Sequence, residues 1–394
     1  MAQRSAVVGH VRTTPAARQL VRVSHEATIV DVSVYVGNFV TKVRSPGRLE
    51  TIRHGAVILA TGADEHRPTA YLYGEDERVW TQLELEERIA RQDEGLARGR
   101  SLVMIQCVGC REQAGGTNYC ARICCSQAIK NALALKKRSP EIEITILFRD
   151  MRTYGFAEEA YRAAADLGVR FVRWEPDGKP EVEAAADGEG VPVLRVTVPD
   201  PILGQRLAFD ADFVVLSAAV VPAAGSAEIA RLFKVAQNPD GFFQEAHVKL
   251  RPVDFAVDGV FCCGTNHYPK HLAEAVAQAH GAAGRAAGLL GRDTVTASGA
   301  VSEVHEQDCV ACGACITACS YGAIGWRETA AGRKAVVNPV LCKGDGLCCA
   351  KCPTDAIVLL HFTNEEVFNQ IDAALAGPDS WTATSKEQPT RARS

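Results

Sequence analysis

Cysteine is the residue type in this sequence with the clearest capacity for chemistry, because 15 cysteines occur among 394 residues. They fall in four places, at 107–125, 262–263, 309–319 and 342–352. A chain that used cysteine only as a small core residue would scatter it along its length. The clustering therefore indicates local cofactor sites, and at this stage zinc and iron–sulfur clusters are both open.

The C-terminal cysteines form two runs of one template. The stretch CVACGACITACS reads C-x2-C-x2-C-x3-C, by which bacterial-type ferredoxins hold cubane clusters, the fourth cysteine of each run binding the other run's cluster. The stretch CKGDGLCCAKCP repeats the template with Asp345 at its second ligand position. One predicted ligand set is Cys309, Cys312, Cys315 and Cys352. The other is Cys319, Cys342, Cys348 and Asp345.

Asp345 leaves an alternative open. Its carboxylate would be a harder donor than a thiolate, and the iron that it binds would be labile. Loss of that iron would leave a three-iron cluster. The extra thiol of Cys349 could replace it. The template favours Asp345, because Cys349 falls one residue into the following predicted helix.

Two stretches upstream repeat one pattern, a hairpin followed by an apolar strand. The first strand is GAVILATG at 55–62, which ends in a small-residue turn, and the second is DFVVLSA at 212–218. The repetition predicts two related α/β domains of the dinucleotide-binding type.

The second of these domains departs from that type at its first turn. Its first strand, 102–106, should lead into G-x-G-x-x-G and a helix that receives a pyrophosphate, but it leads into CVGCREQAGGTNYCARICC. This loop predicts a cluster in place of NAD, with ligands drawn from five cysteines, Cys107, Cys110, Cys120, Cys124 and Cys125. A zinc site or a redox-active dithiol is the alternative.

The first domain shows only the far end of a flavin site. Residues 259–265, GVFCCGT, predict a strand ending in a glycine turn, and an Ala- and Gly-rich helix follows at about 272–290. The helix N-terminus could stabilise negative charge on a flavin ring, although a closely packed core helix is the alternative. Cys262 and Cys263 fit buried apolar thiols better than ligands. No G-x-G-x-x-G occurs in the sequence, so the flavin's phosphate cradle is missing.

Several of these motifs together resemble one family. QCVGC, YCARICCSQAIKNAL, FRDMRTYGFAEEAY, GFFQEAHVKLRPVD, GVFCCGTNHYPKH and the double cluster tail are similar to the A subunit of heterodisulfide reductase and its relatives in flavin-based electron-bifurcating complexes. The resemblance covers about residues 21–358. It implies a thioredoxin-reductase-like core that holds FAD and a cubane, with ferredoxin domains that conduct electrons. The predicted fold class is α/β, with an α+β double-cluster ferredoxin domain at the C-terminus.

The resemblance also suggests individual site residues. Cys107, Cys120, Cys124 and Cys125 would hold the core cluster, and Cys110, where the family usually has serine, would be spare. Lys130 matches a lysine near the flavin ring, although it also fits a solvent-facing helix residue. The residues that would border the flavin are Thr61, Gly62, Gly264 and Thr265.

The expected domains follow the motifs. They are a partial FAD-type domain at 1–100, a second dinucleotide-type domain with the cysteine loop at 101–240, a return to the first at 241–300, a ferredoxin-like domain at 301–376 and a flexible tail at 377–394.

Composition narrows the class of protein. An apolar content of 47% with 23% charged residues is typical of a globular chain, and the net charge of -4 gives no electrostatic reason to bind nucleic acid. The sequence shows neither a secretory signal nor an apolar run long enough to span a membrane, so we expect a cytoplasmic protein without a transmembrane segment.

We therefore expect an oxidoreductase subunit that is active within a complex, with three 4Fe-4S-type clusters and FAD. The flavin would be shared with a partner subunit that supplies the G-x-G-x-x-G cradle, and the electron carriers would be of the ferredoxin or heterodisulfide reductase type. One alternative is a flavin-free electron-transfer subunit with three clusters. Another is a zinc-stabilised interaction protein, which the ferredoxin runs disfavour.

Overall fold

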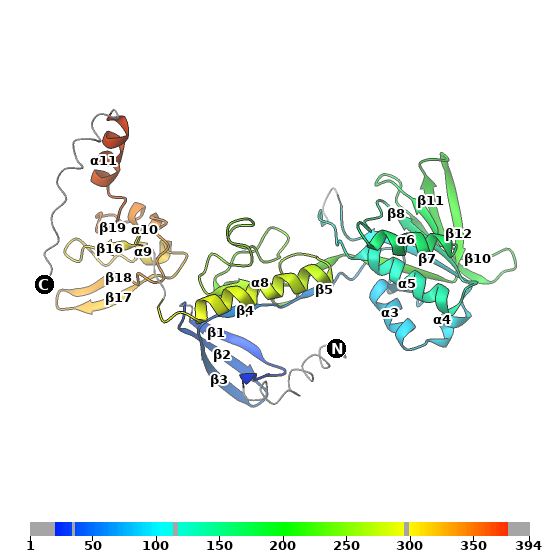
Figure 1. Ribbon diagram of the computed structural model, residues 1–394, viewed down its shortest axis with the longest axis horizontal. Coiled ribbons are helices and arrows are strands. Elements are labelled where there is room, and N and C mark those ends of the chain that lie inside the picture. Colours follow the sequence, from blue (N-terminus) through cyan, green and yellow to red (C-terminus); the bar gives the residue numbers. More distant parts are fainter. Residues whose placement is uncertain (1–19, 34–35, 113–116, 295–298, 377–394) are drawn as a thin grey trace. The chain divides into compact units, whose positions relative to one another are not determined.

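The computed structural model describes residues 20–33, 36–112, 117–294 and 299–376. The expected flexible tail at 377–394 lies outside the described residues. The chain divides into two compact units, which are coloured along the sequence in Figure 1. The larger unit comprises residues 1–32, 42–50 and 56–288, and the smaller comprises residues 33–41, 51–55 and 289–394.

A parallel sheet of order β6-β13-β7-β8-β9 organises the larger unit. Its strands are β6 (Val79–Thr81), β13 (Phe213–Ala218), β7 (Ser101–Val108), β8 (Glu143–Phe148) and β9 (Arg170–Arg173). Helices pack with it, and they are α3 (Gln82–Ala90), α4 (Glu94–Arg98), α5 (Cys124–Arg138) and α6 (Ala157–Asp166). A capping box between Thr81 and Glu84 begins α3 directly after β6.

Strand β7 is buried on both faces. Leu102 and Met104 pack with α5 residues such as Ile129, whereas Val103 and Ile105 pack with Leu194 of a second sheet. That sheet is an antiparallel meander of β10 (Glu181–Ala186), β11 (Pro192–Asp200) and β12 (Gln205–Ala211). Burial from both sides explains why β7 is an almost continuous apolar run.

The predicted flavin end consists of short strands that meet from distant parts of the sequence. β4 (Val57–Leu59) pairs in parallel with β15 (Val260–Cys262), and β5 (Ala63–Glu65) pairs antiparallel with β14 (Val220–Pro222). The Ala- and Gly-rich helix is α8 (Leu272–Leu290), and α7 (Ser226–Phe233) lies upstream of it in the chain. A further sheet has the order β1-β2-β3, with β1 (Thr28–Ser33), β2 (Phe39–Ser45) and β3 (Arg48–His54).

The ferredoxin-like part is built from two small antiparallel pairs and short helices. β16 (Ser302–Val304) pairs with β19 (Ile357–Leu359), and β17 (Ile324–Thr329) pairs with β18 (Gly332–Val337). The helices are α9 (Ala314–Ala318), α10 (Leu347–Ala350) and α11 (Asn364–Leu375). Each cysteine run enters one of the two shortest helices, α9 and α10, and a left-handed glycine, Gly313 or Gly346, precedes each helix.

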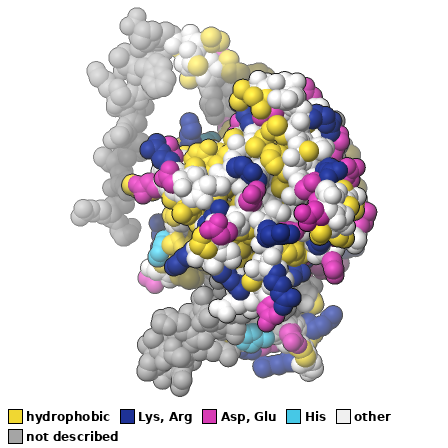
Figure 2. Space-filling view, turned by 90° about the vertical axis from the view of Figure 1, so that its right-hand side faces the viewer, with side chains coloured by type: hydrophobic (Ala, Val, Ile, Leu, Met, Phe, Trp, Pro, Cys, Tyr) yellow, Lys and Arg dark blue, Asp and Glu magenta, His cyan; other side chains and the backbone are white. Residues whose placement is uncertain are grey.

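The surface has mixed charge. Figure 2 shows basic and acidic side chains interspersed over the coloured part of the face that it displays. No helix among the described residues is long and apolar enough to cross a lipid bilayer.

Candidate iron–sulfur and flavin sites

The core cysteine loop begins where β7 ends, at a reversal of strand order. From β7 the chain proceeds to β8 and β9 on one side, whereas β13 and β6 lie on the other side. The carboxyl ends of parallel strands at such a switch point are the usual ligand-binding edge of an α/β sheet. The helix that follows begins at Cys124, so Cys124 and Cys125 occupy its first turn.

Four of the five loop thiols are buried together. Cys107, Cys110, Cys124 and Cys125 belong to the hydrophobic cluster between the two sheets, and Cys120 is half-buried. The Cys107 backbone has a left-handed φ of 65°, which coincides with the irregular pairing between β7 and β13 just before β7 ends at Val108. Cys110 is fully buried and touches Cys107, so the thiol regarded as spare lies in the same cluster as the predicted ligands.

Charge and hydrogen bonds favour a thiolate at Cys107. The Cys110 thiol, assisted by Arg111 and Arg149, lowers the pKa of Cys107 to about 6 despite burial. Cys124 similarly lowers the pKa of its neighbour Cys125, while its own is raised. Thiolates are the species that bind iron, so this loop has the electrostatics of a cluster site.

Arg122 connects the cysteine loop to the segment before α8. Its backbone N–H donates to the Cys120 thiol at 3.3 Å. Its guanidinium donates to the Pro269 carbonyl at 3.2 Å and to the Glu274 carboxylate at 2.8 Å. Because Glu274 lies in the first turn of α8, one side chain couples the predicted cluster loop to the predicted flavin edge.

The strand ends at the flavin edge carry buried polar atoms without partners. Because β4 and β15 are parallel neighbours, their carboxyl ends bring Thr61 close to the turn at Gly264. Asn266 is 2% exposed and donates to the Leu59 carbonyl at 2.9 Å, but its Oδ1 has no partner, and neither has Thr61 Oγ1. Such an unpaired buried atom costs about 1–3 kcal/mol, which a polar ligand would recover.

Glycines leave room at the same place. Gly264 has φ +85° and meets no atom within 4 Å of an added Cβ. Gly62 is also left-handed, with φ 79°. The open space and the unpartnered atoms of Thr61 and Asn266 fit a cradle for a polar cofactor such as a flavin.

Lys270 is a buried cation beside this turn. Its side chain is 3% exposed, it donates to the Gly264 carbonyl, and its Nζ lies 4.1 Å from the centre of the Tyr268 ring. Burial lowers its pKa to about 8. The neighbouring carboxylate of Glu274 is already paired with Arg122. The positive charge of Lys270 would therefore favour a further negatively charged group bound beside it.

Lys130 lies elsewhere on the fold. Its side chain is 54% exposed on α5 and forms an ion pair of 2.6 Å with Glu86 of α3. Its role beside a flavin stays a prediction.

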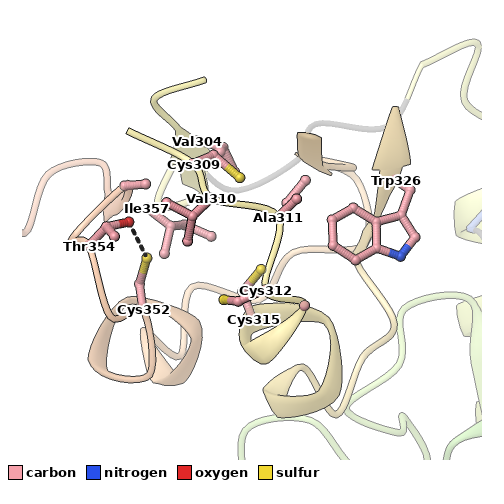
Figure 3. Close-up of a pocket in the computed structure, with 13 residues that line it drawn as sticks. Val304, Cys309, Val310, Ala311, Cys312, Cys315, Trp326, Cys352, Thr354 and Ile357 are labelled. Atoms are coloured by element: carbon pink, nitrogen blue, oxygen red, sulfur yellow. Dashed lines mark hydrogen bonds between the residues drawn. The ribbon is translucent and has the colours of Figure 1, made fainter. Parts of the chain in front are cut away.

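The first ferredoxin ligand set surrounds one cavity. Cys309, Cys312, Cys315 and Cys352 all line it, although Cys352 comes from the other run (Figure 3). Apolar neighbours, among them Val304, Trp326 and Ile357, complete the wall. Burial raises the pKa of Cys352, but backbone N–H groups at 354, 356 and 357 outweigh this effect and lower it. A cavity lined by four thiols, with donors aimed at one of them, fits a cubane cluster.

The thiols of the second predicted ferredoxin ligand set are held by hydrogen-bond contacts with Ser302 and Ala323. The thiols of Cys342 and Cys348 both contact Ser302, and the Cys319 thiol accepts from the Ala323 N–H at 3.3 Å. Asp345 is exposed, and its Oδ1 accepts from the Leu347 N–H at 3.3 Å. Among the described residues, no hydrogen bond joins the Asp345 carboxylate to these thiols.

Within the described ranges, no three His, Cys, Asp or Glu side chains converge closely enough to hold one metal ion.

Sequence reasoning missed Arg122, Lys270 and Ser302. Arg122 could have been suspected from its place within the cysteine loop. The burial of Lys270 and Ser302 leaves no signal in the sequence, because each depends on segments that pack over the residue.

Two ferredoxin-type cysteine runs, with Cys352 of the second run lining the same cavity as the thiols of the first, are typical of an iron–sulfur protein of the dicluster class. The family described as a 4Fe-4S dicluster domain matches residues 308–356. Over most of its length, the chain is similar to the A subunits of heterodisulfide reductases, and it belongs to that family.

Three relatives illustrate the similarity. The A subunit of the ferredoxin:CoB-CoM heterodisulfide reductase of Methanosarcina acetivorans is 34% identical over 82% of this chain and 44% of its own length. The A subunit of the H(2):CoB-CoM heterodisulfide,ferredoxin reductase of Methanothermobacter marburgensis is 36% identical over 86% and 51%. An iron-sulfur A subunit of the CoB–CoM heterodisulfide reductase of Methanopyrus kandleri is 37% identical over 68% and 42%. The chain thus spans about half the length of the curated relatives that it matches.

Solved structures give weaker likenesses. Thioredoxin reductase of T. acidophilum has a TM-score of 0.42 at 13% identity, covering 70% of this chain and 76% of that one. An ornithine N-hydroxylase of Kutzneria sp. 744 has a TM-score of 0.44 at 14% identity, covering 71% and 74%.

Proposed function

We propose that the chain is an iron–sulfur flavoprotein subunit of an oxidoreductase complex, which transfers electrons between ferredoxin-type clusters and FAD. The observation that carries the proposal is the cavity lined by Cys309, Cys312, Cys315 and Cys352. Thiols from two separate runs meet there, as the crossed pattern of two electron-conducting clusters requires.

A third cluster is assigned to the core loop, with Cys107, Cys120, Cys124 and Cys125 as ligands. When bound, such a cluster supplies one-electron transfer. The chain's own contribution is electrostatic: the Cys110 thiol, Arg111 and Arg149 favour the thiolate of Cys107, and Cys124 and Cys125 occupy the first turn of α5.

FAD is assigned to the turn where β4 and β15 end. When bound, it couples one-electron carriers to two-electron chemistry. Thr61, Gly62, Gly264 and Thr265 would border it. Lys270 and Asn266 offer a cation and an unpartnered acceptor there, and Lys130 is retained as a prediction from the family resemblance.

The flavin's phosphates need donors that these residues do not supply. No G-x-G-x-x-G occurs in the 394 residues, and a pyrophosphate buried without backbone donors or a helix N-terminus is costly. We therefore propose that a partner subunit supplies this cradle. The relatives' names include ferredoxin and the CoB-CoM heterodisulfide, so we propose carriers of this low-potential class, with flavin-based bifurcation as the full complex's reaction. Thiolate-held clusters suit the reducing cytoplasm.

Analysis of iron, acid-labile sulfide and extracted flavin in the purified complex tests the proposal. Three clusters predict about twelve iron atoms per chain, or about eleven if one corner is lost. About eight, with the ferredoxin signals intact, would show that the core loop carries no cluster. Absence of flavin from the complex would support the flavin-free electron-transfer subunit instead.

The split flavin site has its own measurement, the FAD affinity of this chain alone and with a partner that carries G-x-G-x-x-G. We expect weak binding by the chain alone and tight binding by the pair. Tight stoichiometric binding by the chain alone would refute the sharing of the site.

A further inference from the structure

Ser302 is the point at which the thiols of the second ferredoxin run meet. It begins β16 and is 4% exposed. Its backbone N–H donates to the Cys342 thiol at 3.4 Å, and its hydroxyl contacts the thiols of Cys348 at 3.3 Å and Cys349 at 3.9 Å. A single buried residue therefore touches Cys349 together with two of the predicted ligands of this run, Cys342 and Cys348.

The eight ferredoxin cysteines divide into two groups of four. Cys309, Cys312, Cys315 and Cys352 line the cavity of the first cluster. The remaining four are Cys319, Cys342, Cys348 and Cys349. Cys348 is buried in the small core of the module, and cysteines of both groups pack against it: Cys319 and Cys349 of the second group, and Cys309, Cys315 and Cys352 of the first. The thiols of Cys348 and Cys349 also contact each other.

Asp345 lies in a different environment. Its side chain is exposed, and its carboxylate caps the start of α10 by accepting from the Leu347 N–H. The hydrogen bond to Leu347 occupies Oδ1, and binding iron through either oxygen would take the carboxylate out of water. Desolvation of a carboxylate is costly, whereas a half-buried thiol loses little solvation on binding iron.

We propose that Cys349, rather than Asp345, supplies the fourth thiolate of the second ferredoxin cluster, and that Ser302 positions the thiols of its run. This inference rests on the proposed function. Ligation forms an Sγ–Fe bond, and the thiol proton passes to solvent without change in the oxidation state of iron. Each cluster then has four cysteine ligands, and the second has no labile oxygen corner.

Two matched variants of the full chain, C349S and D345N, test the ligand. After reconstitution and mild oxidation, electron paramagnetic resonance reports three-iron clusters, and iron analysis reports the lost atom. We expect C349S to show a three-iron signal and to lose about one iron per chain, while D345N keeps the wild-type spectrum. The double variant D345C/C349S should restore the four-iron form, because position 345 is the template position. The signal of the cluster at Cys309, unchanged in all variants, shows that the module has folded.

The opposite pattern, with the iron loss in D345N and none in C349S, would overturn the assignment, and so would no loss in either variant. Absence of both ferredoxin signals from the unsubstituted chain would instead refute the proposed function, so the two failures are distinguishable.

Ser302 has a separate readout. Hydrogen bonds to cluster sulfurs help to set the reduction potential, and loss of a donor destabilises the more negative, reduced form. We expect S302A to lower the potential of the second cluster and to leave the first unchanged. S320A is the control, because Ser320 is exposed and directly follows Cys319. An unchanged potential in S302A, or an equal shift in S320A, would overturn the positioning role.

Discussion

The guanidinium of Arg122 donates to the carboxylate of Glu274 at 2.8 Å, although 152 residues separate the two. Arg122 belongs to the core cysteine loop and Glu274 to the first turn of α8. The pair lowers the pKa of Glu274, chiefly through this hydrogen bond. It joins the segment predicted to hold a cluster to the segment predicted to border a flavin.

A double-mutant cycle measures that connection. R122Q and E274Q should each lower the thermal midpoint, and the double variant should be hardly worse than either, with a coupling of about 1 kcal/mol because the pair is partly exposed. The control is R162Q, which breaks an ion pair with Glu158 on an exposed helix surface and should change little. Strict additivity of R122Q and E274Q would mean that the contact does not contribute.

The crossed cluster assignment predicts the effect of C352S. This change should abolish the cluster held by Cys309, Cys312 and Cys315, because Cys352 lines their cavity. Electron paramagnetic resonance of the reduced protein distinguishes the two ferredoxin clusters. If C352S instead abolished the signal of the cluster that depends on Cys342, the assignment of Cys352 to the first cluster would be wrong.

Gly264 tests the flavin cradle. In G264A the added methyl meets no protein atom within 4 Å, so the free chain should lose only about 1–2 kcal/mol through backbone strain at φ +85°. We expect FAD affinity in the complex to fall at least tenfold, because the methyl would occupy the space assigned to the cofactor. G225A carries the same φ of +85° and also meets no atom, so it controls for strain. Equal FAD affinities in the two variants would show that the flavin does not bind at this turn.

The buried Lys270 predicts a pH dependence of stability. Its folded pKa of about 8 lies below its ordinary value of 10.5, so between these values the unfolded chain binds a proton that the folded chain does not. Stability should therefore rise with pH, by about 1–2 kcal/mol from pH 7.5 to pH 9.5. K270M should lack this rise, and K249M, at an exposed lysine, should keep it. Parallel pH profiles of wild type and K270M in denaturant unfolding would contradict the assignment.

The sequence by itself determined the features whose chemistry is local. The spacing of Cys309, Cys312 and Cys315 is that of one tight loop, and the repeat at Cys342 follows the same template, so ligand spacing alone was enough to predict the dicluster module. The strand at 102–106 and its cysteine loop could be predicted for the same reason, because apolar runs and their turns are encoded over a few residues.

Tertiary structure alone decided which side chains meet. Asp345 holds the template position, yet its side chain is exposed. Ser302, which lies 40 or more residues upstream of the second run, contacts Cys349 as well as Cys342 and Cys348. Lys130 and Lys270 cannot be told apart by type, but one is exposed beside Glu86 and the other is buried beside Gly264. Ligand spacing within a run depends on the local backbone. Burial and contacts between distant residues depend on how separate elements pack, and that information is spread over the whole chain.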